Sequence, residues 1–165
     1  MDMVSRAMAG GGHDAIQTRK APQGGEQPMS QQVLIERFIE VLISGDRQAA
    51  RNIVDECLSA DAPAEAIIEK LFWPTLEQID RLHRQDQLSN ICYNFATRVL
   101  RLLADQMQMR LQTREIADRT LLVCCGPNEG NELACQMAVD MLEASGFKVF
   151  FAGGGIAMDE IKAQV

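Results

Sequence analysis

The strongest constraint in this sequence is a change in the spacing of its apolar residues at Thr120. Before that point, apolar residues recur every three or four positions, which is the period of an amphipathic helix. From Thr120 the run TLLVCC is continuously apolar, as expected of a buried parallel strand; a helical pattern and a second apolar run, FKVFFAG, follow it. The sequence therefore predicts a helical part followed by an α/β part.

Polar interruptions divide the helical part into four amphipathic segments. In SGD, Gly45 suits the end of one helix and Asp46 the start of the next, and Ser89 suits the start of the last helix. Pro74 lies inside the third segment and predicts a kink or a split there. Four amphipathic helices joined by short breaks predict an antiparallel four-helix bundle.

The span from Thr120 to Gly153 reads as one β-α-β unit, which we expect to be right-handed and parallel, with its helix at 132–144. The letters MDEIKAQV begin a further helix. We therefore predict an α/β chain in which a four-helix bundle precedes a partial Rossmann-like, flavodoxin-like β-α-β-α half. The expected divisions are a disordered tail at 1–29, the bundle at 30–113 and the half-domain at 119–165.

A half-domain of this kind has a two-stranded sheet with an open side. We expect either that the chain is a fragment of a longer protein or that a partner chain completes the sheet, and we favour the fragment.

Composition excludes several classes of protein. The net charge of −7 and the pI near 4.8 argue against a nucleic-acid-binding surface. No apolar run approaches the length of a membrane span and no signal peptide is visible, which favours a cytoplasmic protein with no membrane contact. Five scattered cysteines predict reduced, packed thiols, and Cys124 and Cys125 are expected to point to opposite faces of the sheet.

The sequence shows no set of residues that suits catalysis. No nucleophile, base and acid occur at a suggestive spacing, so we expect no enzyme activity from this chain. The loop GPNEGN precedes a helix N-terminus, which is a place where anions bind. It lacks both a lysine and the spacing of a phosphate-binding glycine motif, so support for phosphate binding is weak.

The order of a helical bundle and then a β-α-β unit resembles the cobalamin (B12)-binding module with a four-helix-bundle cap. The stretches that carry the resemblance are PTLEQIDRLHRQDQLSNICYNFAT and GPNEGNELACQMAVDMLEASGFKVFFAGG. It is closest to the B12-dependent photoreceptor and transcriptional-regulator branch, and looser to corrinoid methyltransferase proteins and methionine synthase. The resemblance implies a metal-binding module that takes up the cobalt of a corrinoid and has a regulatory role.

In those families the second stretch carries the motif D/E-x-H-x-x-G, whose histidine replaces the cofactor's own base as the lower cobalt ligand. The same register places Glu129 at the acidic position, Asn131 at the histidine position and Ala134 at the glycine position. The acidic residue would orient the histidine, and an amide is a poor cobalt ligand beside imidazole. No metal ligand is therefore predicted, because Asn131 occupies the position of the lower ligand.

The resemblance also implies an upper-face set in the helical part, a Trp-His pair and then a Glu-His pair ten residues later. His83-Arg84 and Tyr93-Asn94 stand at these positions, so all four residues differ from the family pattern. The predicted cofactor-binding set comprises His83, Arg84, Tyr93, Asn94, Gly126, Glu129 and Asn131.

From these replacements we predict a cobalamin-binding-like sensor or regulatory module with a degenerate or altered cofactor site. One alternative is a functional corrinoid carrier for a methyltransferase-type partner, in which the cofactor keeps its own base or has no lower protein ligand. The other is a scaffold that binds no cofactor and forms homo-oligomers or docks a protein partner through its open sheet edges.

Overall fold

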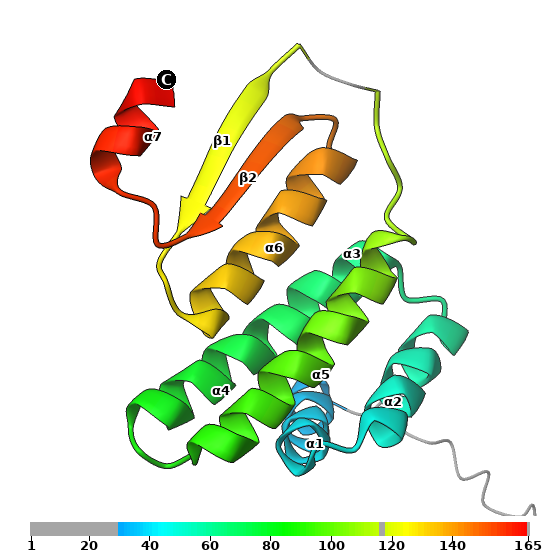
Figure 1. Cartoon of the computed structure of the whole chain (residues 1–165). Coiled ribbons are helices and arrows are strands. Elements are labelled where there is room, and N and C mark those ends of the chain that lie inside the picture. Colours follow the sequence, from blue (N-terminus) through cyan, green and yellow to red (C-terminus); the bar gives the residue numbers. More distant parts are fainter. Residues whose placement is uncertain (1–29, 116–117, 165) are drawn as a thin grey trace, which may run out of the picture.

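The computed structural model describes residues 30–115 and 118–164, so the predicted tail at 1–29 lies outside the described residues. Figure 1 shows a group of helices on which a smaller α/β layer sits. The elements in chain order are α1 (Gln31–Ser44), α2 (Arg47–Ser59), α3 (Ala64–Ile67), the π-helical turn η1 (Ile68–Phe72), α4 (Trp73–Arg84), α5 (Asn90–Gln108), β1 (Thr120–Cys125), α6 (Glu129–Ala144), β2 (Lys148–Gly154) and α7 (Met158–Gln164).

Local capping explains where the first helices begin and end. Gly45 ends α1 in the left-handed conformation, with φ of 77°, and its N–H donates to the carbonyl of Leu42. The carboxylate of Asp46 accepts from two backbone N–H groups in the first turn of α2, and the hydroxyl of Ser89 accepts from one in α5. The boundaries predicted at Gly45, Asp46 and Ser89 are confirmed.

The third helical segment passes Pro74 through a π-helical turn. A proline inside a helix has no N–H to donate, and its ring displaces the carbonyl four residues earlier. The wider turn η1 comes directly before α4, whose first turn contains Pro74. Phe72 and Trp73 keep right-handed helical angles across the junction, so the disturbance predicted at Pro74 is a local widening and the segment is not split.

One hydrophobic core joins the helices α1 to α5. Its fully buried members include Phe38, Leu42, Phe72 and Leu100. Leu133 and Met137 of α6 belong to the same core. Helix α6 therefore packs against the helical part on one side and against the sheet on the other, as Figure 1 shows.

The sheet of the described residues has two parallel strands. Thr120 pairs with Lys148 at one end and Cys125 with Gly154 at the other, with an irregularity after Val123. Helix α6 covers one face, while the other face leaves Leu122 exposed by 36% and Phe150 by 53%. The predicted parallel pair is confirmed, but β1 is only partly buried because one of its faces is open.

The predicted start of the α6 helix at Glu132 is wrong, because α6 begins at Glu129. The side chain of Asn128 caps the helix and accepts from the Asn131 backbone N–H at 2.7 Å. The apolar period begins only at Leu133, because the first turn faces polar groups of other helices. The loop therefore spans 126–128, and Glu129 and Asn131 lie in the first turn of α6.

None of the helices in the described part of the chain has the length and apolar character that crossing a membrane requires.

Candidate functional site

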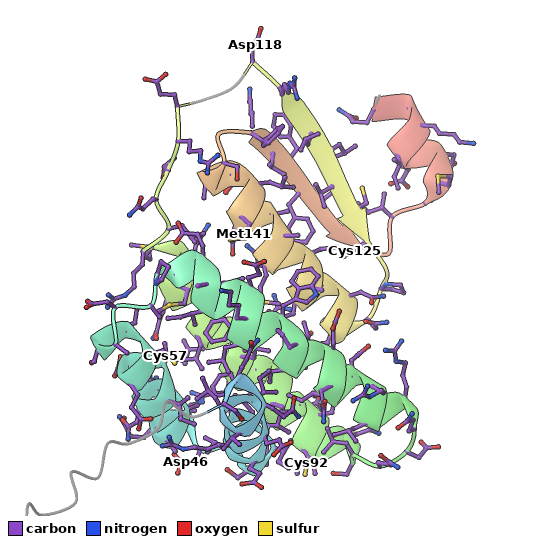
Figure 2. The ribbon with its side chains drawn as sticks, turned by 180° about the vertical axis from the view of Figure 1, so that it is seen from behind. Asp46, Cys57, Cys92, Asp118, Cys125 and Met141 are labelled. Carbon is purple, nitrogen blue, oxygen red and sulfur yellow. The ribbon has the colours of Figure 1, made fainter. Side chains whose placement is uncertain are left out.

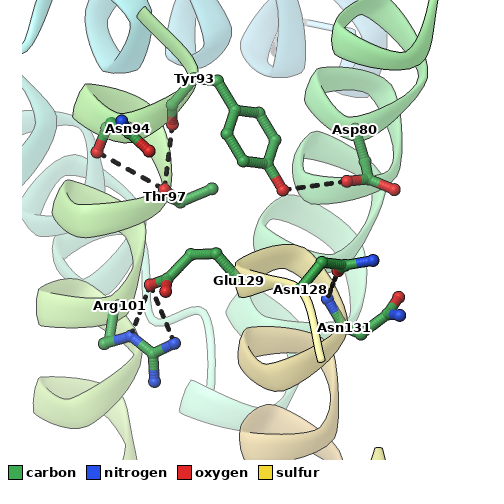
Figure 3. Close-up of polar contacts among 8 residues, drawn as sticks. All are labelled: Asp80, Tyr93, Asn94, Thr97, Arg101, Asn128, Glu129 and Asn131. Carbon is green, nitrogen blue, oxygen red and sulfur yellow. Dashed lines mark hydrogen bonds and ion pairs between the residues drawn. The ribbon is translucent and has the colours of Figure 1, made fainter. Parts of the chain in front are cut away.

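The N-terminus of α6 meets α4 and α5 in a polar cluster, which we call the α6 junction. It consists of Asp80, Tyr93, Arg101, Glu129 and Gly130. Figure 3 shows the Tyr93–Asp80 and Arg101–Glu129 contacts, which join elements that are far apart in the sequence. Of the predicted site residues, Tyr93 and Glu129 belong to the junction itself, and the others lie around it.

Tyr93 is the centre of the α6 junction and is only 7% exposed. Its hydroxyl donates to Asp80 Oδ1 at 3.0 Å and lies against Gly130 in the first turn of α6. Burial, followed by the hydrogen bond to Asp80, raises the pKa of Tyr93 to about 12. The hydroxyl therefore stays protonated at neutral pH and keeps its role as a donor.

Gly130 allows α6 to approach the helical part this closely. A Cβ at this position would lie 2.6 Å from both Asp80 Oδ1 and Tyr93 Oη, so a larger residue would displace the Asp80 and Tyr93 side chains and disturb their contact. Gly130 lies in the first turn of α6, where backbone N–H groups have no partner within the helix. The Tyr93 hydroxyl lies beside this turn.

A second contact joins Glu129 to Arg101 of α5. Arg101 Nη2 lies 3.0 Å from Glu129 Oε1, and Arg101 Nε lies 3.3 Å from the same oxygen. Both side chains are partly exposed. In this structure Glu129 pairs with a guanidinium, whereas the resemblance gives its position the role of orienting an imidazole.

Asn131 lies on the side of the junction away from Arg101 (Figure 3). Its side chain is exposed and packs over Gly126, where a Cβ would overlap with the Asn131 amide nitrogen. Gly126 and Asn131 therefore contact each other across the short loop, but neither enters the Tyr93 contacts.

His83 and Arg84 lie beside the junction at the end of α4. The His83 ring stacks on Tyr93 with centroids 4.1 Å apart, and its Nε2 is 2.8 Å from Asn90 Oδ1. Arg84 Nη2 lies 3.2 Å from Asp80 Oδ2, so Asp80 holds both Tyr93 and Arg84. Both residues thus support the Tyr93–Asp80 contact.

Asn94 is exposed and joins the neighbouring contacts through its backbone. Its carbonyl accepts a long hydrogen bond, of 3.4 Å, from the Thr97 hydroxyl. The predicted upper-face position at 94 therefore lies at the edge of the site.

The sequence-based prediction missed Asp80, Arg101 and Gly130. A signal for Arg101 was available, because Tyr93, Thr97 and Arg101 follow a four-residue spacing that places them on one face of a helix. Asp80 likewise stands four residues before Arg84. Gly130 had no local signal, since its need for a small side chain comes from contacts with other helices.

The donor groups do not fit a cobalt held by a histidine of this loop. His83, at the end of α4, is the one histidine among the described residues. Its Nε2 forms a hydrogen bond with Asn90, at the start of α5. The first turn of α6 offers the amide of Asn131 at the corresponding position. Within the described ranges, no group of three or more His, Cys, Asp or Glu side chains is arranged to hold a metal ion.

Comparison with protein families connects the helical part to cobalamin. Residues 34–106 match a family model described as a B12 binding domain. This range runs from α1 into α5 and includes Asp80, Tyr93 and Arg101. The helical part is thus similar to a B12 binding domain, and cobalamin is a candidate cofactor. A search of curated proteins finds no match.

Among solved structures, the chain is similar to the monomethylamine corrinoid protein of Methanosarcina barkeri. The TM-score is 0.49 and the sequence identity is 12%. The similarity covers 82% of this chain and 64% of that protein, so the chain spans less than two thirds of its length.

Proposed function

We propose that this chain is a cobalamin-binding-like sensor or regulatory module whose cofactor site is altered, with no catalytic activity of its own. In this proposal α1 to α5 act as a four-helix cap of the kind found in the photoreceptor and regulator branch. The match of residues 34–106 to a B12 binding domain supports the cofactor class. The observation that carries the altered site is the Tyr93 hydroxyl, which is hydrogen-bonded to Asp80 and packed against Gly130 at a position that the resemblance assigns to the upper face of the cofactor.

The α6 junction offers a route for a signal. A ligand that enters between the helical part and α6 has to separate Tyr93 from Gly130 and Arg101 from Glu129. The partly exposed Arg101–Glu129 ion pair contributes about 0–1 kcal/mol. Even a weak, millimolar ligand has about 4 kcal/mol of binding free energy, which is enough to open these contacts and move α6 with its sheet.

The test is an absorbance titration of the full chain with hydroxocobalamin, methylcobalamin and adenosylcobalamin. We expect weak binding, without the spectral change that a histidine ligand produces on replacing the cofactor's own base. A histidine-type spectrum with micromolar affinity would contradict the altered site.

The variant Asn131→His restores an imidazole at the predicted lower-ligand position. If the remaining pocket accepts a corrinoid, Asn131→His binds more tightly than the native chain and shows the histidine-type spectrum. The matched control is Asn52→His, because Asn52 is an exposed residue on α2, remote from the junction. Equal behaviour of the two variants would argue against a corrinoid pocket beside α6.

A corrinoid carrier for a methyltransferase-type partner is the second candidate. The amide at position 131 favours it, because a cofactor that keeps its own base needs no imidazole from the protein. Tight binding of methylcobalamin with an unchanged spectrum would support the carrier over the regulatory module.

A further inference from the structure

Two cysteines that are ten residues apart in the sequence meet between β1 and α6. Cys125 is the last residue of β1, and Cys135 lies in the second turn of α6. The Cys135 thiol is close enough to Cys125 to help raise its pKa, and both residues are only partly buried. The pair is thus close together and accessible to small molecules in solution.

The alternation of β1 explains why Cys125, and not Cys124, faces α6. Successive side chains of a strand point to opposite faces. The exposed Leu122 marks the open face, and Cys124 shares its parity, whereas Cys125 lies on the face that α6 covers.

The turns of α6 explain the position of Cys135. Leu133 belongs to the helical core, whereas Val139 is buried without belonging to that core and so packs toward the sheet. Cys135 precedes Val139 by four residues and lies on the same side of the helix. The covered face of β1 and the sheet side of α6 therefore bring the two thiols together.

The remaining cysteines serve as internal controls. Cys57 and Cys92 lie in the helical part, well away from Cys125 in Figure 2. Cys124 is adjacent to Cys125 in the chain but has the opposite orientation, and neighbouring cysteines rarely reach disulfide geometry.

We propose that Cys125 and Cys135 are a thiol-oxidation site that forms a reversible intramolecular disulfide by exchange with a low-molecular-weight disulfide such as oxidised glutathione. The thiolate of one cysteine attacks a sulfur of the glutathione disulfide and releases one glutathione thiolate. The second cysteine, after losing its proton, attacks the mixed disulfide and releases the second glutathione. Two protein thiols are oxidised and one glutathione disulfide is reduced to two thiols.

This disulfide would connect the end of β1 to α6 across the loop 126–128, which precedes Glu129 and Gly130. Oxidation therefore restrains the segment that leads into the α6 junction. Formation of this disulfide requires no bound corrinoid, because it involves only the two thiols and the residues around them.

The pH determines how fast the exchange proceeds. Burial raises the pKa of the Cys125 thiol, and Cys135 beside it adds to that effect. The thiolate is the attacking species, so we expect the exchange rate to increase as the pH rises from 7 toward 9.

The test treats the reduced full-length chain with oxidised glutathione at about pH 8, followed by alkylation and mass spectrometry without reduction. We expect two of the five thiols to be lost, with no retained glutathione. Cleavage after glutamate separates fragment 116–129, which holds Cys124 and Cys125, from fragment 133–143, which holds Cys135. The oxidised protein should contain these two fragments joined, and dithiothreitol should restore all five thiols.

Matched variants assign the bond. Cys125→Ser and Cys135→Ser should each abolish the joined fragments, whereas Cys124→Ser should retain them. Circular dichroism checks that each variant folds, and alanine versions replace any serine variant that does not. The proposal is overturned if Cys135→Ser still loses two thiols, if Cys57 or Cys92 forms the bridge, or if glutathione remains attached to the native protein without a bridge.

Discussion

The helical part and the sheet differ in how completely they bury their large apolar side chains. Phe38 and Phe72 of the helical part are fully buried and stack with centroids 5.7 Å apart. Phe150 of β2 is 53% exposed, with the Lys148 ammonium 5.2 Å from its ring centroid. The difference shows that the helices enclose a core of their own, whereas the sheet depends on α6 for the one face that is covered.

Helix α6 is therefore the element through which the stability of the two regions is linked. The side chains of Leu133 and Met137 are buried among the helices, and the opposite side of α6 covers β1 and β2. Substitutions in α6 should therefore lower the stability of both regions, whereas substitutions on the open face of the sheet should affect the sheet alone.

Leu133→Ala should destabilise the protein more than any other substitution proposed for this chain. Leu133 is fully buried, so the variant should lose about 2–5 kcal/mol of unfolding free energy through lost contacts and a cavity. The control is Phe150→Ala, which should change stability by less than about 0.5 kcal/mol because the ring is exposed. Urea denaturation followed by circular dichroism measures both, and equal losses would show that the sheet face contributes as much to stability as the helical core.

The next effect concerns Asp140, which is 2% exposed and has an Oδ2 without a hydrogen-bond partner. Burial raises its pKa to about 6, and the carboxylates of Glu143 and Asp105 add to this. The folded protein thus holds the Asp140 proton more tightly than the unfolded chain does. Stability should fall by up to about 3 kcal/mol as the pH rises from about 4 to about 6.

The variant Asp140→Asn cannot ionise, so its unfolding free energy should lack this decrease. Urea denaturation between pH 4 and pH 7 measures the difference between the two proteins. A constant difference across that range would show that Asp140 has an ordinary pKa and that its surroundings on α6 are wetter than the structure indicates.

A smaller effect is expected at the α6 junction. Tyr93→Phe removes the donor to Asp80 at a buried position, so it should lower stability by about 1–3 kcal/mol. The matched control is Thr97→Val, which removes a hydroxyl bonded at 3.0 Å to a carbonyl of its own helix. Hydrogen exchange should accelerate in the first turn of α6 for Tyr93→Phe alone, and equal acceleration in both variants would contradict a specific role for Tyr93.

The two ion pairs at Arg37 and Arg101 should differ only slightly in their contribution to stability. Arg37 and Glu56 form an exposed pair at 2.8 Å within the helical part, and Arg37→Gln should change stability by less than about 0.5 kcal/mol. Arg101→Gln removes the less exposed pair at the junction and should have the larger effect, up to about 1 kcal/mol. Thermal denaturation at low and high salt compares them, and a larger loss for Arg37→Gln would reverse the expected order.

The sequence was sufficient to predict features that arise from neighbouring residues. The helix ends at Gly45, Asp46 and Ser89 follow from caps that act within one turn. The strand at TLLVCC follows from an unbroken apolar run, and its bounds match β1. The start of α6 was misplaced because its first turn is polar, so the apolar period does not mark it.

The candidate site was predicted only in part, because its contacts join different elements. Glu129 was identified as a site residue, but its partner Arg101 is 28 residues away. Tyr93 was identified through the register of a resemblance, whereas its contacts with Asp80 and Gly130 depend on how α6 packs against α4 and α5. No periodicity in one segment contains that information.

The order of helices and strands follows from the sequence alone, because capping, proline geometry and apolar periodicity act over a few residues. Only tertiary packing places α6 in the helical core, brings Gly130 close to Tyr93 and puts Cys125 and Cys135 at the same interface of β1 and α6. These outcomes depend on close packing between segments far apart in the chain, where the size and direction of each side chain set which groups meet.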